Sequence, residues 1–132
     1  LSMSDARRIV DAAVAESEKR GVHTAVAVVD NRGDLIVVAR EDGARSYYPD
    51  VAYGKAMAAA LWQRDTRDLS RDAGAVSQQG HVNHLNGGRI VFAIGGVLLR
   101  QDGEVIGALG VGGSGPESDE EIAKIAASTL DG

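Results

Sequence analysis

The chain has 132 residues, a length that suits one domain with a single hydrophobic core. Its formal net charge is −5 and no stretch forms a basic arm, which argues against a nucleic-acid partner, because phosphate binding needs a clustered basic face. Cysteine is absent, so disulfides, thiolate nucleophiles and cysteine metal sites are excluded.

Small residues dominate the apolar part of the sequence. Aromatic residues make up only 4%, whereas there are 17 glycines and many alanines and valines, so we expect helices that pack closely on a sheet. No apolar run approaches the roughly 20 residues of a membrane span, and no signal peptide is visible. We therefore expect no membrane association and a cytoplasmic location.

The first predicted element is a helix over residues 2–21. Apolar residues recur there at helical spacing, Ser2 or Ser4 can cap its start, and Gly21 can end it. Thr24–Val29 (TAVAVV) is apolar throughout, as expected of a strand covered on both faces. After a turn at DNRGD, Leu35–Ala39 (LIVVA) is predicted to return as the second strand of a hairpin.

The middle of the chain is predicted to be helical and then irregular. Residues 51–62 (VAYGKAMAAALW) indicate a second helix with an alanine face, and a short helical turn follows within residues 65–74, capped by Asp65 or Thr66. Residues 74–88 lack periodicity and are rich in Gly, Asn, Gln and Ser, so we expect a long loop, which in a compact domain is often functional.

The last third predicts strands and a final helix. Residues 89–113 indicate three short strands, with a hairpin at Asp102-Gly103 and glycines that thin the last strand for close backbone approach. Residues 118–130 indicate a helix in which Ser118 and Glu121 match a capping box. The expected fold is a single α+β domain over residues 1–132, with a roughly five-stranded antiparallel sheet flanked by helices.

The glycine-rich stretch GVGGSG before the last helix does not indicate a nucleotide site. An anion-binding helix start needs free N–H groups and a positive field, but three consecutive acids, Asp119 to Glu121, fill this first turn. No Walker lysine follows. We expect no nucleotide cofactor.

Three charged residues stand at unusual positions. Arg40 and Asp42 directly follow an apolar strand, and Lys55 lies in an otherwise apolar helix. One interpretation places Lys55 on the solvated face of its helix and Arg40 at an exposed strand end. The other places Arg40 and Lys55 at the mouth of an anion-binding pocket that Tyr47 and Tyr48 could line.

Two of the three histidines lie together in GHVNHLNGG. The spacing of His81 and His84 suits a divalent metal, although a third ligand is needed, and it also suits an acid–base pair, which needs only a pocket. Asn83 and Asn86 could orient a substrate. A solvated polar loop is the third interpretation. His23 is expected to be structural or exposed.

Several stretches together resemble the GlcG/HbpS family, also called the haem-degrading or PduO C-terminal-like domain. They are residues 25–44, 52–62, 95–113 and 118–126, in the family's order and over nearly the whole chain. The resemblance implies an antiparallel sheet between helices and a homo-oligomer (dimer, tetramer or octamer). It also implies haem or another tetrapyrrole as a ligand of some members. Arg40, Asp42 and Lys55 fall on recurrent positions of the family.

Two functional hypotheses follow. The first is a binding protein for a small-molecule ligand, haem or another tetrapyrrole, in which a histidine is the axial ligand. The second is an isomerase, lyase or hydrolase without an organic cofactor that acts on a small carboxylate-bearing metabolite. Arg40 or Lys55 would then hold the anion, and His81 or His84 would move a proton or bind a metal. A regulatory subunit without a ligand is the remaining alternative.

Overall fold

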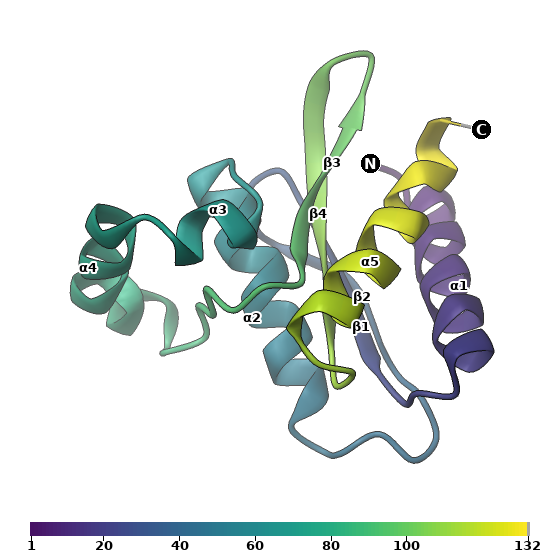
Figure 1. The fold of residues 1–132 in the computed structure, drawn as a ribbon. Helices are drawn as coiled ribbons and strands as arrows, with labels where there is room; N and C mark the ends of the chain where they lie inside the picture. The colour runs from purple at the N-terminus through teal and green to yellow at the C-terminus, as the bar shows by residue number, and fades with distance from the viewer. Residues whose placement is uncertain (132) are drawn as a thin grey trace.

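The computed structural model describes residues 1–131 and is built around one antiparallel sheet (Figure 1). Its strands are β1 (Ala25–Asp30), β2 (Leu35–Arg40), β3 (Gly96–Gln101) and β4 (Glu104–Gly112), in the order β2-β1-β4-β3. Both predicted hairpins are present. At the β3–β4 turn, Asp102 and Gly103 both have positive φ, 53° and 81°, which is the backbone that a tight two-residue hairpin turn requires.

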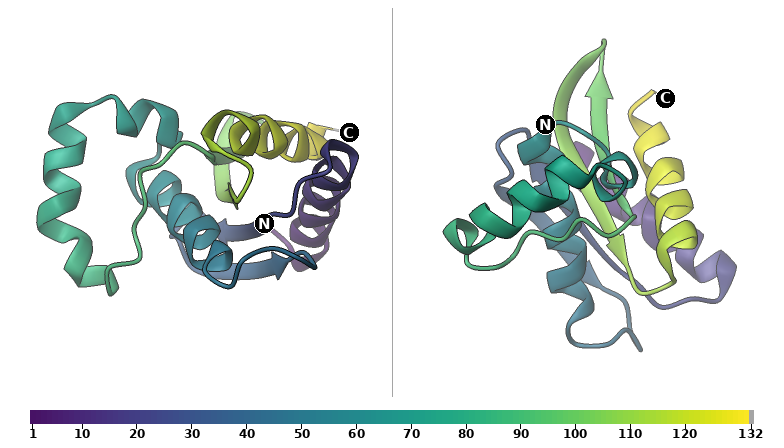
Figure 2. Two further views of the ribbon diagram at one scale, coloured as in Figure 1. Left: turned by 60° about the horizontal axis from the view of Figure 1, so that its bottom comes forward. Right: turned by 60° about the vertical axis from the view of Figure 1, so that its left-hand side comes forward.

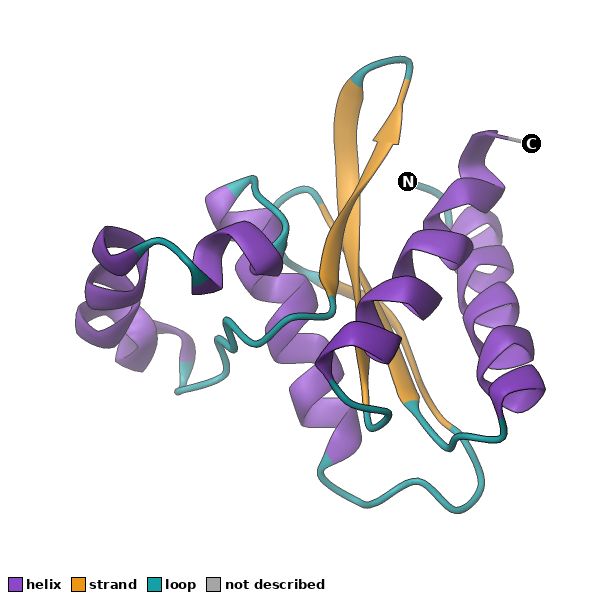
Figure 3. Cartoon of the chain, in the orientation of Figure 1, coloured by secondary structure: helices purple, strands orange, loops and turns teal. Residues whose placement is uncertain are grey.

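Helices cover both faces of this sheet (Figures 1 and 3). On one face lie α1 (Met3–Arg20) and α5 (Pro116–Ala127), and on the other lies α2 (Tyr48–Trp62). Ser2 caps α1 through the N–H of Asp5, and Gly21 ends it in the left-handed conformation, as predicted. A short 3-10 turn, η2 (Ser128–Asp131), follows α5. Within the described residues, no helix has the length and apolar character needed to span a bilayer.

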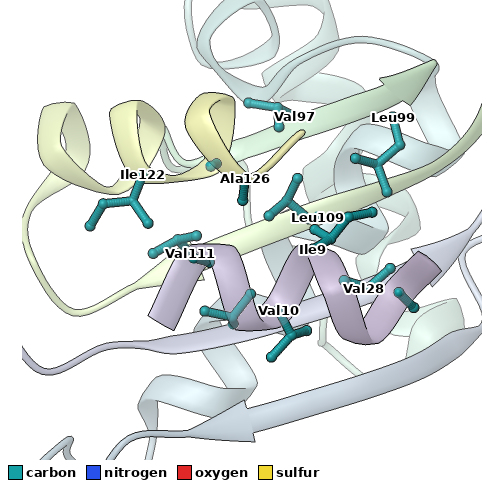
Figure 4. Packing of buried hydrophobic residues seen from close by; sticks show 13 residues of the cluster. Ile9, Val10, Val28, Val97, Leu99, Leu109, Val111, Ile122 and Ala126 are labelled. Atoms are coloured by element: carbon teal, nitrogen blue, oxygen red, sulfur yellow. The ribbon is translucent and has the colours of Figure 1, made fainter. Parts of the chain in front are cut away.

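The two sides of the sheet are packed differently. Under α1 and α5 lies a cluster of branched side chains that includes Ile9, Leu109 and Ile122 (Figure 4). Under α2 the packing is backbone against backbone, because a Cβ on Gly110 would collide with the carbonyl oxygen of Ala52. The glycine in β4 therefore allows the close approach of helix and sheet that the composition predicted.

Residues 63–95 form a separate feature, which we call the arm. It comprises α3 (Thr66–Ser70), α4 (Ala73–Val82) and the 3-10 helix η1 (Asn83–Asn86), and it extends beyond α2, away from the sheet (Figure 2). A small cluster that includes Leu69, Ile90 and Phe92 joins it to α2. The rings of Trp62 and Phe92 meet edge to face at 4.9 Å.

Three predictions about elements were wrong. The sheet has four strands because residues 89–95 do not form a strand; the N–H of Val91 donates to the carbonyl oxygen of Gly54 in α2. Most of the predicted loop 74–88 is helical, because Asp72 caps α4 by accepting a hydrogen bond from the N–H of Ala75. Helix α5 starts at Pro116 rather than at a Ser118 capping box; Gly115 precedes it, and Asp119 turns inward.

Candidate functional site

One end of the molecule gathers the ends of most elements. The end of α1, the start of β1, the end of β2, the start of α2, the end of β4 and the start of α5 all lie at the bottom of Figure 1. Two cavities open at this end, and Tyr48 and Gly113 stand between them: a Cβ on Gly113 would lie 2.6 Å from the Tyr48 ring and 2.9 Å from the carbonyl oxygen of His23.

The larger cavity is a groove between α1 and the end of β2. Its volume is 510 Å³, within the range of about 300–1,000 Å³ that small-molecule and cofactor sites occupy. Its wall combines apolar and charged side chains: Val14, Val22 and Ala39 with Glu18, His23, Arg40, Glu41 and Asp42. We call it the His23 groove.

Strand pairing explains why these residues meet. In the β1–β2 hairpin Ala25 pairs with Arg40, and the N–H of Glu41 donates to the carbonyl oxygen of Thr24 at 3.0 Å. One step further along the same antiparallel ladder, His23 comes to the side of Asp42. The groove is therefore a product of the hairpin register.

A buried polar network forms the base of this groove. The hydroxyls of Ser17 and Thr24 lie 2.7 Å apart and are fully buried. The Thr24 hydroxyl and N–H each donate to the Glu41 carboxylate at 3.4 Å. These bonds hold the Glu41 carboxylate against the protein and satisfy the two hydroxyls.

His23 and Arg40 are exposed side chains that offer nitrogen groups to the groove. The His23 ring lies against Gly43, where a Cβ would be 3.4 Å from the ring, and Gly43 has a φ of +85° that favours glycine. Arg40 is in none of the ion pairs found among residues 1–131. The groove can therefore offer an imidazole and a guanidinium to a ligand at once.

The second cavity, of 270 Å³, contains a buried ion pair. Lys55 Nζ donates to Asp119 Oδ2 at 3.0 Å and to the carbonyl oxygen of Val111 at 2.9 Å. Tyr47 and Tyr48 stand at its edge with their rings 5.0 Å apart, edge to face. We call it the Lys55 cavity.

The solvated position considered for Lys55 was wrong, since this side chain is 3% exposed within the tightly packed α2. Asp119 is not an exposed acid of the first turn of α5. It is buried as the ion-pair partner of Lys55. Lys55 and Tyr47 line one cavity, whereas Arg40 and Asp42 line the other. The predicted anion pocket is thus divided into two sites at one end of the sheet.

His81 and His84 lie elsewhere, exposed near the end of the arm. Asn83 is structural, since its Oδ1 accepts a hydrogen bond from the N–H of Ile90 at 2.9 Å. Asn86 lines a different hollow, between η1 and α2, with Arg89. No group of three or more His, Cys, Asp or Glu side chains suited to a metal ion occurs in residues 1–131. The metal and acid–base hypotheses for the histidine pair stay predictions.

His23 was expected to be structural or exposed; it is exposed, and it lines the larger cavity. The β1–β2 hairpin carried a signal for this position, because counting its two strands and their turn in register places His23, two residues before β1, near Glu41 or Asp42. The bulge near Val29 shifts this register by one residue, so the precise neighbour could not be counted from the sequence.

Comparison with known proteins gives a consistent family. The chain is 33% identical over 132 residues to the corrinoid adenosyltransferase PduO of Salmonella typhimurium, covering 98% of this chain but only 39% of PduO. It is 31% identical over 119 residues to protein GlcG of Escherichia coli K12, covering 84% of this chain and 80% of GlcG.

Solved structures agree with these relatives. A double mutant of Streptomyces reticuli HbpS superposes with a TM-score of 0.86 at 31% identity, covering 98% of this chain and 86% of the other. A PduOC:haem complex superposes with a TM-score of 0.86 at 32% identity, covering 99% and 95%. The family described as haem degrading protein HbpS-like matches residues 1–128. The chain therefore belongs to the HbpS-like family, which is related to haem.

Proposed function

We propose that this protein binds haem, or a closely related tetrapyrrole, in the His23 groove. The observation that carries the proposal is the combination of an exposed imidazole, an exposed guanidinium and an apolar wall around one cavity of 510 Å³. The haem complex of a relative supports haem over other cofactors of similar size. His23 is the proposed axial ligand.

The residues of the groove fit the chemistry of haem. A porphyrin needs apolar contacts, which Val14, Val22 and Ala39 offer. Its propionates need a cation, and Arg40 is the cation of this groove. We expect the propionates to face Arg40, because Glu18 and Asp42 would repel them. When bound, haem would supply an iron centre for ligand binding or electron transfer.

The test is a titration of haemin into the full chain, followed by its Soret band. We expect a saturable band in the wild type that His23→Ala abolishes. Arg40→Gln removes one charge-assisted contact and should weaken binding by about tenfold. An unchanged titration midpoint in a folded His23→Ala variant would contradict the proposal.

The two arm histidines supply matched controls. His81→Ala and His84→Ala each remove an exposed imidazole that does not line the groove, so we expect both variants to bind haemin as the wild type does. If either variant loses the band while His23→Ala keeps it, the ligand is bound at the arm.

The homo-oligomer implied by the family resemblance also stays a proposal. The His23 groove is open, so a second copy of the chain could close it. Sedimentation analysis with and without haemin distinguishes a ligand-independent oligomer from a monomer.

A further inference from the structure

The Lys55 cavity holds a charged pair that haem binding in the His23 groove does not use. Lys55 is 3% exposed and Asp119 is 2% exposed. A buried ion pair is weak evidence of a stabilising role, because removing two charges from water offsets much of their attraction. Both side chains also line a cavity, so the pair borders space that a small ligand can occupy.

The donors and acceptors of the pair are not all used within the protein. Asp119 is satisfied on both oxygens: Oδ2 by Lys55, and Oδ1 by the N–H and hydroxyl of Ser114 at 2.9 and 2.6 Å. Lys55 Nζ has two acceptors among residues 1–131, Asp119 and the carbonyl oxygen of Val111, yet an ammonium carries three N–H groups. One N–H of this ammonium therefore has no acceptor among the described residues.

The same cavity adjoins the start of helix α5. Gly115 precedes the helix without a side-chain cap, and both Gly115 and Pro116 line the cavity. Pro116 has no N–H and the N–H of Asp119 donates to the carbonyl oxygen of Gly115 at 2.8 Å, so the helix acts on the cavity through the partial positive charge of its N-terminal end. The acids Glu117 and Glu120 near this end are balanced by two cations: both bond to Arg67, at 2.6 and 2.9 Å, and Glu120 also pairs with Lys124 at 3.4 Å.

Charge and size then select a ligand class. Lys55 and Asp119 cancel one another, so the start of α5 leaves about half a positive charge at the cavity. That favours a monoanion over a phosphate dianion. The volume of 270 Å³ is about half that of the His23 groove and suits a ligand of few atoms.

We propose that the Lys55 cavity is a binding site for a small monocarboxylate, held by Lys55 and the start of α5 between the two tyrosines. The site does not depend on haem and uses none of the residues of the His23 groove. Asp119 is a positioning residue: it holds the ammonium at the cavity wall.

The test is a titration of the isotopically labelled chain with acetate, lactate or inorganic phosphate at constant ionic strength, followed by NMR. We expect saturable shifts of the Ala93, Gly113 and Gly115 amides with both carboxylates. Phosphate should bind more weakly. Absence of saturable shifts, or tighter binding of phosphate than of acetate, overturns the proposal.

Variants at Ala93 separate charge from shape. Ala93 is exposed and lines the cavity, so Ala93→Glu adds a repelling carboxylate and should weaken acetate binding about threefold relative to the neutral Ala93→Gln. Ser77→Glu adds the same charge on the arm and should change nothing. Equal affinities of the two Ala93 variants contradict the proposal.

Lys55 itself is tested in a double variant, because removing Lys55 alone would leave the Asp119 carboxylate buried without its partner. Lys55→Met combined with Asp119→Asn keeps an acceptor for Ser114 and should abolish saturable acetate shifts while circular dichroism shows a folded chain. Haemin binding should persist in this double variant, so failure here is distinguishable from failure of the haem proposal. A folded double variant with undiminished acetate binding overturns the assignment.

Discussion

The body of the molecule and its arm differ in how much of their structure is held by burial. In the body, β1 is buried along almost its whole length, and α1, α2 and α5 press against the sheet. In the arm, Ala75 is the only buried residue of α4, and none of η1 is buried. The arm is held by caps, by ion pairs of Arg64 and Arg67, and by one small apolar cluster that joins it to α2.

The same division applies to the candidate functional residues. The histidine pair that stands out in the sequence lies apart from the two cavities of the fold. The conspicuous histidines are on the arm, exposed, whereas the His23 groove lies in the body and the Lys55 cavity is lined by the body and by Ala93 of the arm, where strand ends and helix ends meet. The body is therefore expected to respond strongly to small changes in side chains, and the arm weakly.

The largest expected effect is the loss of a core leucine. Leu109→Ala in β4 leaves a cavity in a fully buried cluster and should lower the free energy of unfolding by about 2–5 kcal/mol. Leu85→Ala in η1 removes the same atoms from a side chain that is 73% exposed and should stay within about 0.5 kcal/mol of the wild type. Urea unfolding followed by circular dichroism measures both, and similar costs would remove the distinction.

Two glycines test the same contrast with an added methyl group. Gly110→Ala puts a Cβ into the carbonyl of Ala52 and should cost about 1–3 kcal/mol, since helix and sheet must move apart. Gly80→Ala meets nothing within 4 Å and should stabilise α4 by about 0.5–1 kcal/mol. Thermal unfolding of both variants checks the opposite signs, and a stabilised Gly110→Ala variant would contradict close packing under α2.

The secondary structure of the body was largely predictable, because each of its sequence patterns is compatible with only one kind of element. A fully apolar run such as Thr24–Val29 needs cover on both faces, and an Asp-Gly pair between strands needs a tight turn. The starts and ends of α1 followed from its capping residues. Even the close approach at Gly110 followed from the excess of small residues in the sequence.

The arm was not predictable because local polar bonds decide its structure. Residues 74–88 lack an apolar stripe, yet Asp72 supplies a cap that starts α4, and Asn83 ties η1 back to Ile90. In the candidate sites, the sequence singled out Lys55 and Arg40. It did not predict that Asp119 pairs with Lys55 or that His23 shares the groove with Arg40. Asp119 is distant in sequence from Lys55, and a bulge governs the register that brings His23 to the side of Asp42.

The polar base of the His23 groove is expected to matter more than its size suggests. Thr24→Val keeps the shape of the side chain but leaves the buried Ser17 hydroxyl without its partner and removes one of the two hydrogen bonds from Thr24 to the Glu41 carboxylate. We expect a loss of about 1–3 kcal/mol in the free energy of unfolding. Ser77→Ala on the arm, an exposed hydroxyl, is the control. Equal stability of Thr24→Val and wild type in urea would show that water replaces the network.

The smallest expected effect is a local response of the arm to acid. The hydrogen bond from Arg64, and next the one from the N–H of Ala75, holds the pKa of Asp72 below its ordinary value of 3.8. A lowered folded pKa means that the contribution of this carboxylate is complete above pH 3.8 and is lost as the pH falls through the folded pKa. The start of α4 should therefore loosen only in that acidic range.

Trp62 can report this loosening, because it is the chain's single tryptophan and its Nε1 donates to Gln78 Oε1 on α4 at 3.0 Å. We expect a fluorescence change below pH 3.8 that precedes loss of the sheet signal in circular dichroism. Asp72→Asn keeps a side-chain acceptor for Ala75 but cannot titrate, so its fluorescence should lack this acidic step. If the step persists in Asp72→Asn, carboxylates of the body cause it, and the arm does not open separately from the sheet.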